Sequence, residues 1–285
     1  MATITNQAAL SYNGITTLSN IAVGELVEVL TVTKTAADTT YTPGSTKTYA
    51  ISLVNSGAAP FTGLTITDTL GSYAFNNGTL YPLTYVTGSL LYYVNGILQA
   101  TPAIADTAPL TVTGLSVPAG GSAMLVYSAT VNEFAPLGVE DSIVNTVSVT
   151  GGGLAAPVTA TETINASTTP QLSISKSICP ATIAENGTLT YTLTLQNRGN
   201  TAATASDELV ITDTFDPILK DLSVSFNGTV WTEGVHYTYD AATGAFATVT
   251  GALTVPAATY TQDAATGIYT VDPGVSNLVV TGTLG

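Results

Sequence analysis

Lysine, aspartate and asparagine occur in this sequence at positions where an alternating pattern favours apolar side chains. Lys34 lies in phase with Leu30 and Val32, so its side chain is predicted to point into a core. Asp68 and Asn145 occupy the same kind of position in two other alternating segments. Three polar side chains from three different strands are therefore predicted to point inward together.

The same three residue types occur a second time. Lys176 and Asp213 repeat the setting of the first lysine and aspartate in the second half of the chain. The third member is Asn6, which lies near the N-terminus, far from its two partners in the sequence. Asn6 is in phase with a row of four residues, which are Ile4, Ala8, Leu10 and Tyr12. We expect this row and Asn6 to serve in polymerisation, by completing the second half of a neighbouring copy.

A lysine buried beside a carboxyl group and a carboxamide can form an isopeptide bond. Burial disfavours the charged ammonium and lowers the pKa of a lysine by up to ~3–5 units, which frees the amine to act as a nucleophile. A protonated aspartic acid can polarise the carboxamide and transfer protons. We therefore expect a Lys34–Asn145 bond assisted by Asp68, and the corresponding bond in the second set. The arrangement resembles the Lys–Asn bonds of collagen-binding adhesins and pilins of Gram-positive bacteria.

The alternative is that each set is a buried hydrogen-bonded network without covalent chemistry. Lys47 and Lys220 lack the repeated setting and are expected to be solvated. His236 is the only histidine and Cys179 the only cysteine, which leaves no histidine or cysteine metal cluster and no intramolecular disulfide. No glycine-rich phosphate loop opens a helix. We therefore expect no catalysis on a substrate, no cofactor and no metal ion.

The strands that must position these residues are predicted from alternation with a period of two, which dominates the chain. Turn signals such as Asn95 followed by Gly96 separate the alternating segments at sandwich-like spacing. An all-β fold is therefore expected, with two tandem immunoglobulin-like antiparallel β-sandwiches and an N-terminal donor-strand arm.

An internal repeat predicts the domain organisation. Segments 29–34, 48–57 and 65–70 return as 172–176, 190–199 and 210–215. The first copy closes with segment 142–150, whereas the second has no such segment, and a match to it stands at 2–11. We expect an arm over 1–25, a first repeat over 26–168 and a second, incomplete repeat over 169–285.

Four segments resemble the conserved repeat domain of bacterial and archaeal surface proteins, a domain of unknown function. They are the Val-Thr-Lys-Thr of 32–35, the segment 43–57, the Thr-Asp-Thr-Leu of 67–70 and the segment 143–149. The resemblance implies an extracellular structural or adhesive module with an immunoglobulin-like fold, and it implies no catalysis. The sequence departs from the family pattern where the second repeat lacks its last strands.

The composition narrows the choice of partners. A formal net charge of −14 disfavours nucleic acid and anionic lipid. Hydrophobic residues make up 45% of the 285 residues and charged residues 8%, as in half-buried strands with hydroxyl-bearing outer faces. The N-terminal segment lacks an apolar stretch after a basic one, and no long apolar run follows, so neither a signal peptide nor a membrane span is expected.

These observations together predict a structural subunit of an extracellular filament, a pilus-like or appendage fibre on a cell or spore surface. An open sheet edge pairs readily with another strand, so the N-terminal strand of one copy is expected to complete the second repeat of the next. Such a contact joins two different surfaces and can propagate head to tail as a homopolymer. The alternative is a monomeric cell-surface adhesin that binds a host protein or glycan through aromatic residues such as Tyr92, Tyr93 or Trp231.

Overall fold

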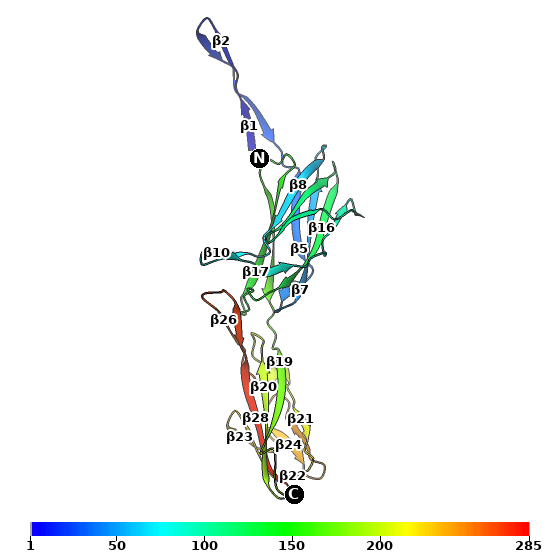
Figure 1. Cartoon of the computed structure of the whole chain (residues 1–285), viewed down its shortest axis with the longest axis vertical. Helices are drawn as coiled ribbons and strands as arrows, with labels where there is room; N and C mark the ends of the chain where they lie inside the picture. Colours follow the sequence, from blue (N-terminus) through cyan, green and yellow to red (C-terminus); the bar gives the residue numbers. More distant parts are fainter. Residues whose placement is uncertain (1, 285) are drawn as a thin grey trace. The chain divides into compact units, whose positions relative to one another are not determined.

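The structure of the chain is a computed structural model that describes residues 2–284. Its regular structure consists of strands, and the one helical element of the described part is the short 3-10 helix η1 (Ala205–Asp207). The predicted all-β class with antiparallel sheets is therefore confirmed (Figure 1). The chain forms two compact units. One comprises the described residues up to Thr39 together with Gly44–Asn132 and Val144–Ile164, and the other comprises Thr40–Pro43, Glu133–Ile143 and the described residues from Asn165 onward.

The first unit contains two main sheets. One is built from β5 (Leu30–Ala36), β7 (Thr46–Asn55), β11 (Leu83–Tyr85), β12 (Leu91–Val94), β13 (Ile97–Leu98) and β16 (Ser122–Val131). Its order is β13-β12-β16-β7-β5, with β11 also pairing to β16. The other sheet contains β8 (Phe61–Asp68), β14 (Ala103–Thr107), β15 (Leu110–Val117), β17 (Ser142–Gly151) and β18 (Val158–Ala166), in the order β14-β15-β8-β17-β18. A separate hairpin joins β9 (Tyr73–Phe75) to β10 (Gly78–Leu80).

The core of the first unit lies between these two sheets. Buried and exposed residues alternate along β5, β7, β16 and β17, because successive side chains of a strand point to opposite faces. The Tyr92 hydroxyl of β12 donates a 2.7 Å hydrogen bond to the carbonyl oxygen of Ser116 in β15, which ties one sheet to the other. Polar residues on the inner faces therefore meet across the sandwich.

The second unit is built around one five-stranded sheet. Its strands are β19 (Leu172–Cys179), β20 (Thr188–Asn197), β22 (Leu219–Phe226), β23 (Thr229–Trp231) and β28 (Gly274–Leu284), in the order β19-β20-β28-β22-β23. A smaller sheet has the order β21-β25-β24, with β21 (Thr212–Thr214), β24 (Tyr237–Asp240) and β25 (Ala245–Thr248). The remaining pairs are the hairpin β26 (Thr259–Gln262) to β27 (Tyr269–Asp272), and β6 (Thr40–Tyr41) with residues 165 and 166.

The two units differ at the strand that carries the repeated Thr-Asp-Thr motif, residues 67–69 and 212–214. In the first unit, β8 has a hydrogen-bonded neighbour on each edge, β15 and β17. In the second unit, β21 carries Asp213 as β8 carries Asp68, but within the described residues it pairs with β25 alone. Strand β8 spans eight residues and β21 only three. One edge of the smaller sheet is therefore open, and the strand there is short.

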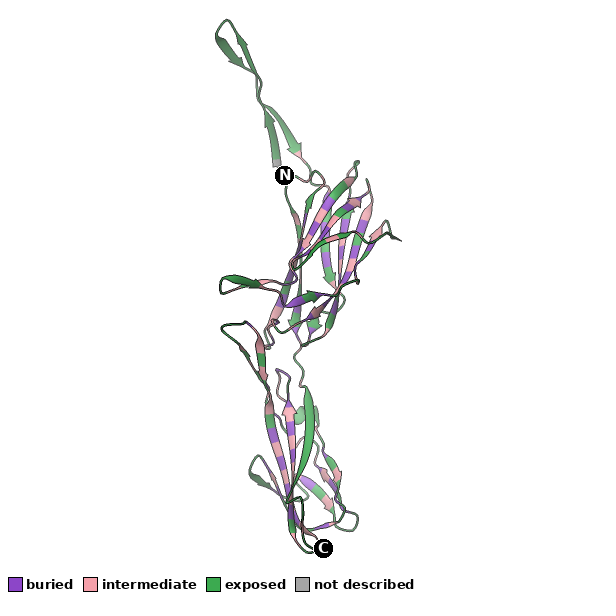
Figure 2. Cartoon of the chain, in the orientation of Figure 1, coloured by how far each residue is buried: buried purple, intermediate pink, exposed green. Residues whose placement is uncertain are grey.

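The N-terminal arm is a long hairpin. Strand β1 (Ala2–Asn6) pairs with β4 (Ala22–Leu26), and β2 (Ala9–Tyr12) pairs with β3 (Ile15–Leu18). The turn is formed by Asn13 and Gly14, both with positive φ, as a two-residue hairpin turn requires. Figure 2 shows that both limbs are exposed. The sequence predicted a single free strand here, whereas the structure has two limbs of two strands each, and the limbs pair with each other.

Candidate functional site

Lys34 and Asp68 form an ion pair inside the first unit. Lys34 Nζ donates to Asp68 Oδ2 at 2.5 Å, and neither side chain has any exposed surface. Lys34 comes from β5 in one sheet and Asp68 from the end of β8 in the other, so the pair joins the two sheets. Lys34 Nζ also lies 5.1 Å from the centre of the Tyr49 ring.

Tyr127 connects this ion pair to Asn145. The Tyr127 hydroxyl donates to Asp68 Oδ2 at 2.8 Å and accepts a hydrogen bond from Asn145 Nδ2 at 3.1 Å. All three side chains are buried. The structure thus places Lys34, Asp68 and Asn145 in one network, linked through Tyr127 instead of by a direct lysine–asparagine hydrogen bond. The sequence pattern did not single out Tyr127, because an inward tyrosine among Leu and Ala is indistinguishable from an ordinary core aromatic.

The carbonyl group of the Asn145 side chain is itself held by two donors. The Thr69 hydroxyl donates to Asn145 Oδ1 at 3.3 Å, and the backbone N–H of Gly71 donates to the same oxygen at 3.2 Å. When an amine attacks a carboxamide carbon, negative charge develops on this oxygen. Donors already aimed at it stabilise that charge, as in an oxyanion hole. Two hydrogen-bond donors are therefore in place for any charge that develops on Asn145 Oδ1.

The environment also lowers the pKa of Lys34. Burial lowers the pKa of Lys34 to about 8, and attraction to Asp68, with a smaller effect of Glu162, offsets only part of that shift. Burial and the negative charge of Asp68 raise the pKa of Tyr127, which therefore stays protonated and can keep donating to the carboxylate. A lysine with a pKa near 8 carries a substantial fraction of nucleophilic amine under mildly alkaline conditions.

This shift predicts a pH dependence in an Asn145→Ala variant, where no Lys34–Asn145 bond can form. Between pH 8 and pH 10 the unfolded chain keeps the Lys34 proton, since its pKa is then about 10.5, while the folded chain loses it. The free energy of unfolding should therefore rise with pH in this window, by about 2 kcal/mol. Above pH 10, tyrosines such as Tyr127, whose pKa is raised in the folded state, lower the free energy of unfolding as the pH rises.

Urea denaturation at closely spaced pH values measures this effect. The matched control adds Lys34→Met to the same variant, and the rise should then disappear. A free energy of unfolding that stays level from pH 8 to pH 10 in Asn145→Ala would contradict the lowered pKa.

The second set is only partly assembled. Lys176 Nζ donates to Asp213 Oδ2 at 2.5 Å, and it lies 4.3 Å from the centre of the Tyr191 ring. The Lys176 side chain is 38% exposed and that of Asp213 17%, in contrast to the enclosed first pair. Asn6 belongs to the arm, where it is opposite Ala22. The structure therefore brings together two of the three members predicted for this set.

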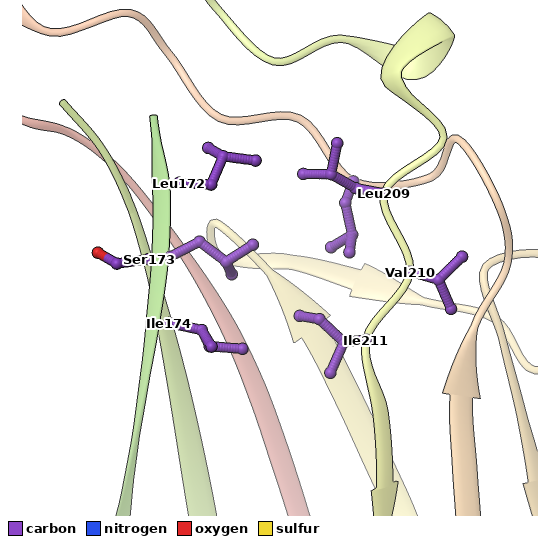
Figure 3. A pocket seen from close by; sticks show the side chains of 8 residues that line it. Leu172, Ser173, Ile174, Leu209, Val210 and Ile211 are labelled. Carbon is purple, nitrogen blue, oxygen red and sulfur yellow. The ribbon is translucent and has the colours of Figure 1, made fainter. Parts of the chain in front are cut away.

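The inner face of β19 is open beside this pair. Every residue of β19 is exposed, whereas the corresponding residues of β5 alternate between buried and exposed. Figure 3 shows the apolar groove that results, with Leu172 and Ile174 of β19 facing Leu209 and Ile211. Ile174 is 56% exposed. Leu195 and Leu253 also line the groove.

The residues predicted for polymerisation are available on the arm. Ile4, Leu10 and Tyr12 are exposed large hydrophobic residues, with Leu10 at 66%. Asn6 and Ala8 are exposed as well. These apolar side chains are exposed to water in the hairpin. Covering them with a partner surface would therefore be favourable.

The structure also places the other residues that the sequence analysis considered. Lys47 was expected to be solvated, and this is wrong, because its side chain is only 9% exposed and lies 3.7 Å from an Asp38 oxygen. Lys47 is the second residue of β7, where the side chain belongs to the buried side of the strand. Tyr92 and Trp231 are buried, so neither is available as an aromatic surface for a ligand. His236 stacks on Trp231, and Cys179 is exposed.

Two further findings concern the described part of the chain. No group of three or more His, Cys, Asp or Glu side chains there is arranged to hold a metal ion. None of its helical segments has the length and apolar character needed to cross a membrane.

Comparison with known proteins gives no family. No protein-family model and no curated protein sequence matches the chain. Among solved structures, it is similar to BcpA, the major pilin subunit of Bacillus cereus, at 12% identity and a TM-score of 0.36, covering 96% of this chain and 73% of that one. It is similar to the pilus backbone protein RrgB of Streptococcus pneumoniae at 13% identity and a TM-score of 0.34, covering 86% and 55%.

A third similar structure is a family 123 glycoside hydrolase from Clostridium perfringens, at 12% identity and a TM-score of 0.30, covering 47% of this chain and 27% of that one. The chain thus spans about a quarter of the hydrolase and about half of RrgB. Because all of these TM-scores are low, no function follows from the likeness.

Proposed function

We propose that the chain is a structural subunit of an extracellular filament on a cell or spore surface, assembled head to tail by donor-strand complementation. In this proposal residues 1–25 are the donor arm, 26–168 the first immunoglobulin-like repeat and 169–285 the second, incomplete repeat. The observation that carries the proposal is the open edge of β21 beside the exposed face of β19, in a chain that also presents an exposed apolar arm.

The first repeat indicates what the second repeat needs. In the first repeat, β17 covers the edge of β8, and the inner face of β5 is buried. The segment of the arm around Asn6 resembles β17 around Asn145, since each asparagine follows an isoleucine by two positions. A strand that fits one edge in this protein should fit the corresponding edge of another copy. Donor and acceptor are different surfaces, so the contact can repeat along a filament.

We further propose that Lys–Asn isopeptide bonds lock both repeats. The neutral amine of Lys34 attacks Cγ of Asn145, a new C–N bond forms, and the bond to Nδ2 breaks. Asp68 relays one proton from the attacking nitrogen to Nδ2, which leaves as ammonia. The reaction exchanges one amide for another and needs no oxidant or further reactant. In the second repeat, Lys176 and Asp213 take these roles, and Asn6 comes from the neighbouring subunit.

A deletion tests the proposed assembly. Removing residues 2–23 should leave soluble single subunits, because it removes the donor and leaves the acceptor unoccupied. A milder test places charges on the apolar row with Leu10→Asp and Tyr12→Asp, which should abolish filaments in electron micrographs. Burying a charged carboxylate in the apolar contact between subunits costs several kcal/mol.

The matched control is Thr3→Asp with Ser11→Asp, on the opposite face of the same hairpin, which should assemble normally. Filaments that persist after the deletion would refute donation by this arm.

A further inference from the structure

We propose, on the basis of the assembly above, that the arm of a second copy enters as an intact two-stranded hairpin, with Ala8 opposite Asp213. Residues 8–12 of the first limb pair with residues 209–213, and the apolar face of the hairpin covers β19. The partner of the open edge is thus a second copy of this chain, and it contributes two strands.

The hairpin has a more apolar face, to which the first limb contributes Ile4, Leu10 and Tyr12 and the second limb contributes Ile15. Cross-strand partners in an antiparallel pair lie on the same face. The register therefore places Ile4 with Gly24, Leu10 with Thr17, and Tyr12 with Ile15. The opposite face is more polar, with the pairs Thr3 with Glu25, Thr5 with Val23, Ala9 with Leu18 and Ser11 with Thr16. Opening the hairpin to donate one strand would separate the two halves of its apolar face.

The first unit uses a hairpin for the same task. There β17 pairs with β8, and β18 lies on the far side of β17 in the same sheet. These strands span ten and nine residues. The limbs of the arm, residues 2–12 and 15–26, have comparable length. The arm therefore matches the whole β17–β18 hairpin in size, and not only strand β17.

The register follows from the first unit. Val147 is opposite Asp68, and Val149 is opposite Ile66. Ala8 stands two positions after Asn6, as Val147 stands two after Asn145, and Asp213 corresponds to Asp68.

The same alignment places Leu10 opposite Ile211 and Tyr12 opposite Leu209. These two residues line the groove of Figure 3, so the apolar row of the arm would fill it.

The joint differs from the internal site in its polar surroundings. Tyr127 is opposite Tyr49 in the first unit, and the corresponding partner of Tyr191 is Val280. No tyrosine hydroxyl therefore stands between Asp213 and the carboxamide of an incoming Asn6. The docked hairpin would bury Lys176 and place Asn6 directly beside the Lys176–Asp213 pair.

Disulfide capture tests the register in a Cys179→Ser, Asn6→Ala background, which has neither the native thiol nor the proposed isopeptide joint. Ala9 and Thr212 would be opposite on the outer face, so Ala9→Cys with Thr212→Cys should give a ladder of multimers on a nonreducing gel. Ala9→Cys with Val210→Cys should give little, because a disulfide requires Cα atoms within about 7 Å and this pair is offset by two residues. Thr67→Cys with Ser148→Cys is the matched intramolecular control, since these two residues are opposite in the first unit.

A locked hairpin tests whether both strands enter together. Ser11 and Thr16 are opposite in the arm, with their hydroxyl oxygens 2.9 Å apart. The Cys179→Ser chain with Ser11→Cys and Thr16→Cys, oxidised before assembly, should form filaments to the same extent as the reduced form.

Loss of assembly only on oxidation would show that the hairpin must open, and capture at Val210 instead of Thr212 would show a different register. Either result overturns this inference and leaves strand donation standing. Absence of filaments and of capture in every variant, including the parent chain, would instead overturn the proposed assembly itself.

Discussion

Boiling assembled fibres in strong denaturant is expected to leave a ladder of covalent multimers on a denaturing gel. Lys176→Ala or Asn6→Ala should collapse the ladder to single subunits, because each removes one partner of the proposed bond between subunits. Without that bond the joint depends on strand hydrogen bonds, each worth about 0.5–1.5 kcal/mol net, and on burial of the apolar row at roughly 25 cal/mol per Å². Denaturant removes both contributions, whereas an amide bond survives.

Controls separate this joint from the internal site and from docking itself. Lys34→Ala should keep the ladder, because it affects only the bond inside the subunit. Asn6→Ala should still form filaments before denaturation, since the apolar face of the arm is unchanged. If boiled, reduced fibres contain only single subunits of unmodified sequence mass, neither bond forms, and the two sets are buried polar networks.

The existing geometry of the second set makes this prediction specific. Lys176 and Asp213 are already paired at 2.5 Å in the single chain, so these two groups are together before the arm arrives. Thr214 follows Asp213 as Thr69 follows Asp68, and it would supply the hydroxyl donor to the Asn6 carbonyl oxygen. Thr214→Val is therefore expected to slow appearance of the ladder while leaving docking intact.

Inside the subunit, Lys34→Ala is expected to change both mass and stability. The wild-type chain should be lighter than its sequence mass by one ammonia, and the variant should match its own sequence mass. The variant should also unfold more easily by about 3–5 kcal/mol or more, because removing one partner leaves Asp68 buried without a counter-charge. Intact-mass measurement and urea denaturation give the two readouts.

Lys47→Ala is the matched control for this variant. Lys47 is also largely buried, but its partner Asp38 is 66% exposed and 3.7 Å away, so the pair should contribute only about 0–1 kcal/mol. The Lys47 variant should keep the ammonia loss of the wild type. A wild-type chain of full sequence mass would refute the internal bond, and Asn145→Ala would then differ from it only by the loss of hydrogen bonds.

The sequence by itself determined that the segments around Lys34, Asp68 and Asn145 are strands, and it determined which side of β5, β8 and β17 faces inward. Alternation is a local property of an extended chain, so the phase of Lys34, Asp68 and Asn145 could be inferred from their neighbours, and all three are buried in the structure. The internal repeat likewise identified the aspartates of β8 and β21 as equivalent residues.

Only the tertiary structure decided which groups meet. The placement of Tyr127 between Asp68 and Asn145 depends on how one sheet packs against the other. The periodicity of a single strand does not predict that packing. The pairing of the arm into a hairpin, and the exposure of Lys176 beside an open edge, depend on which strands find hydrogen-bond partners. Pairing is set by register and by contacts between residues far apart in the chain, so a local pattern predicts a strand without predicting its neighbour.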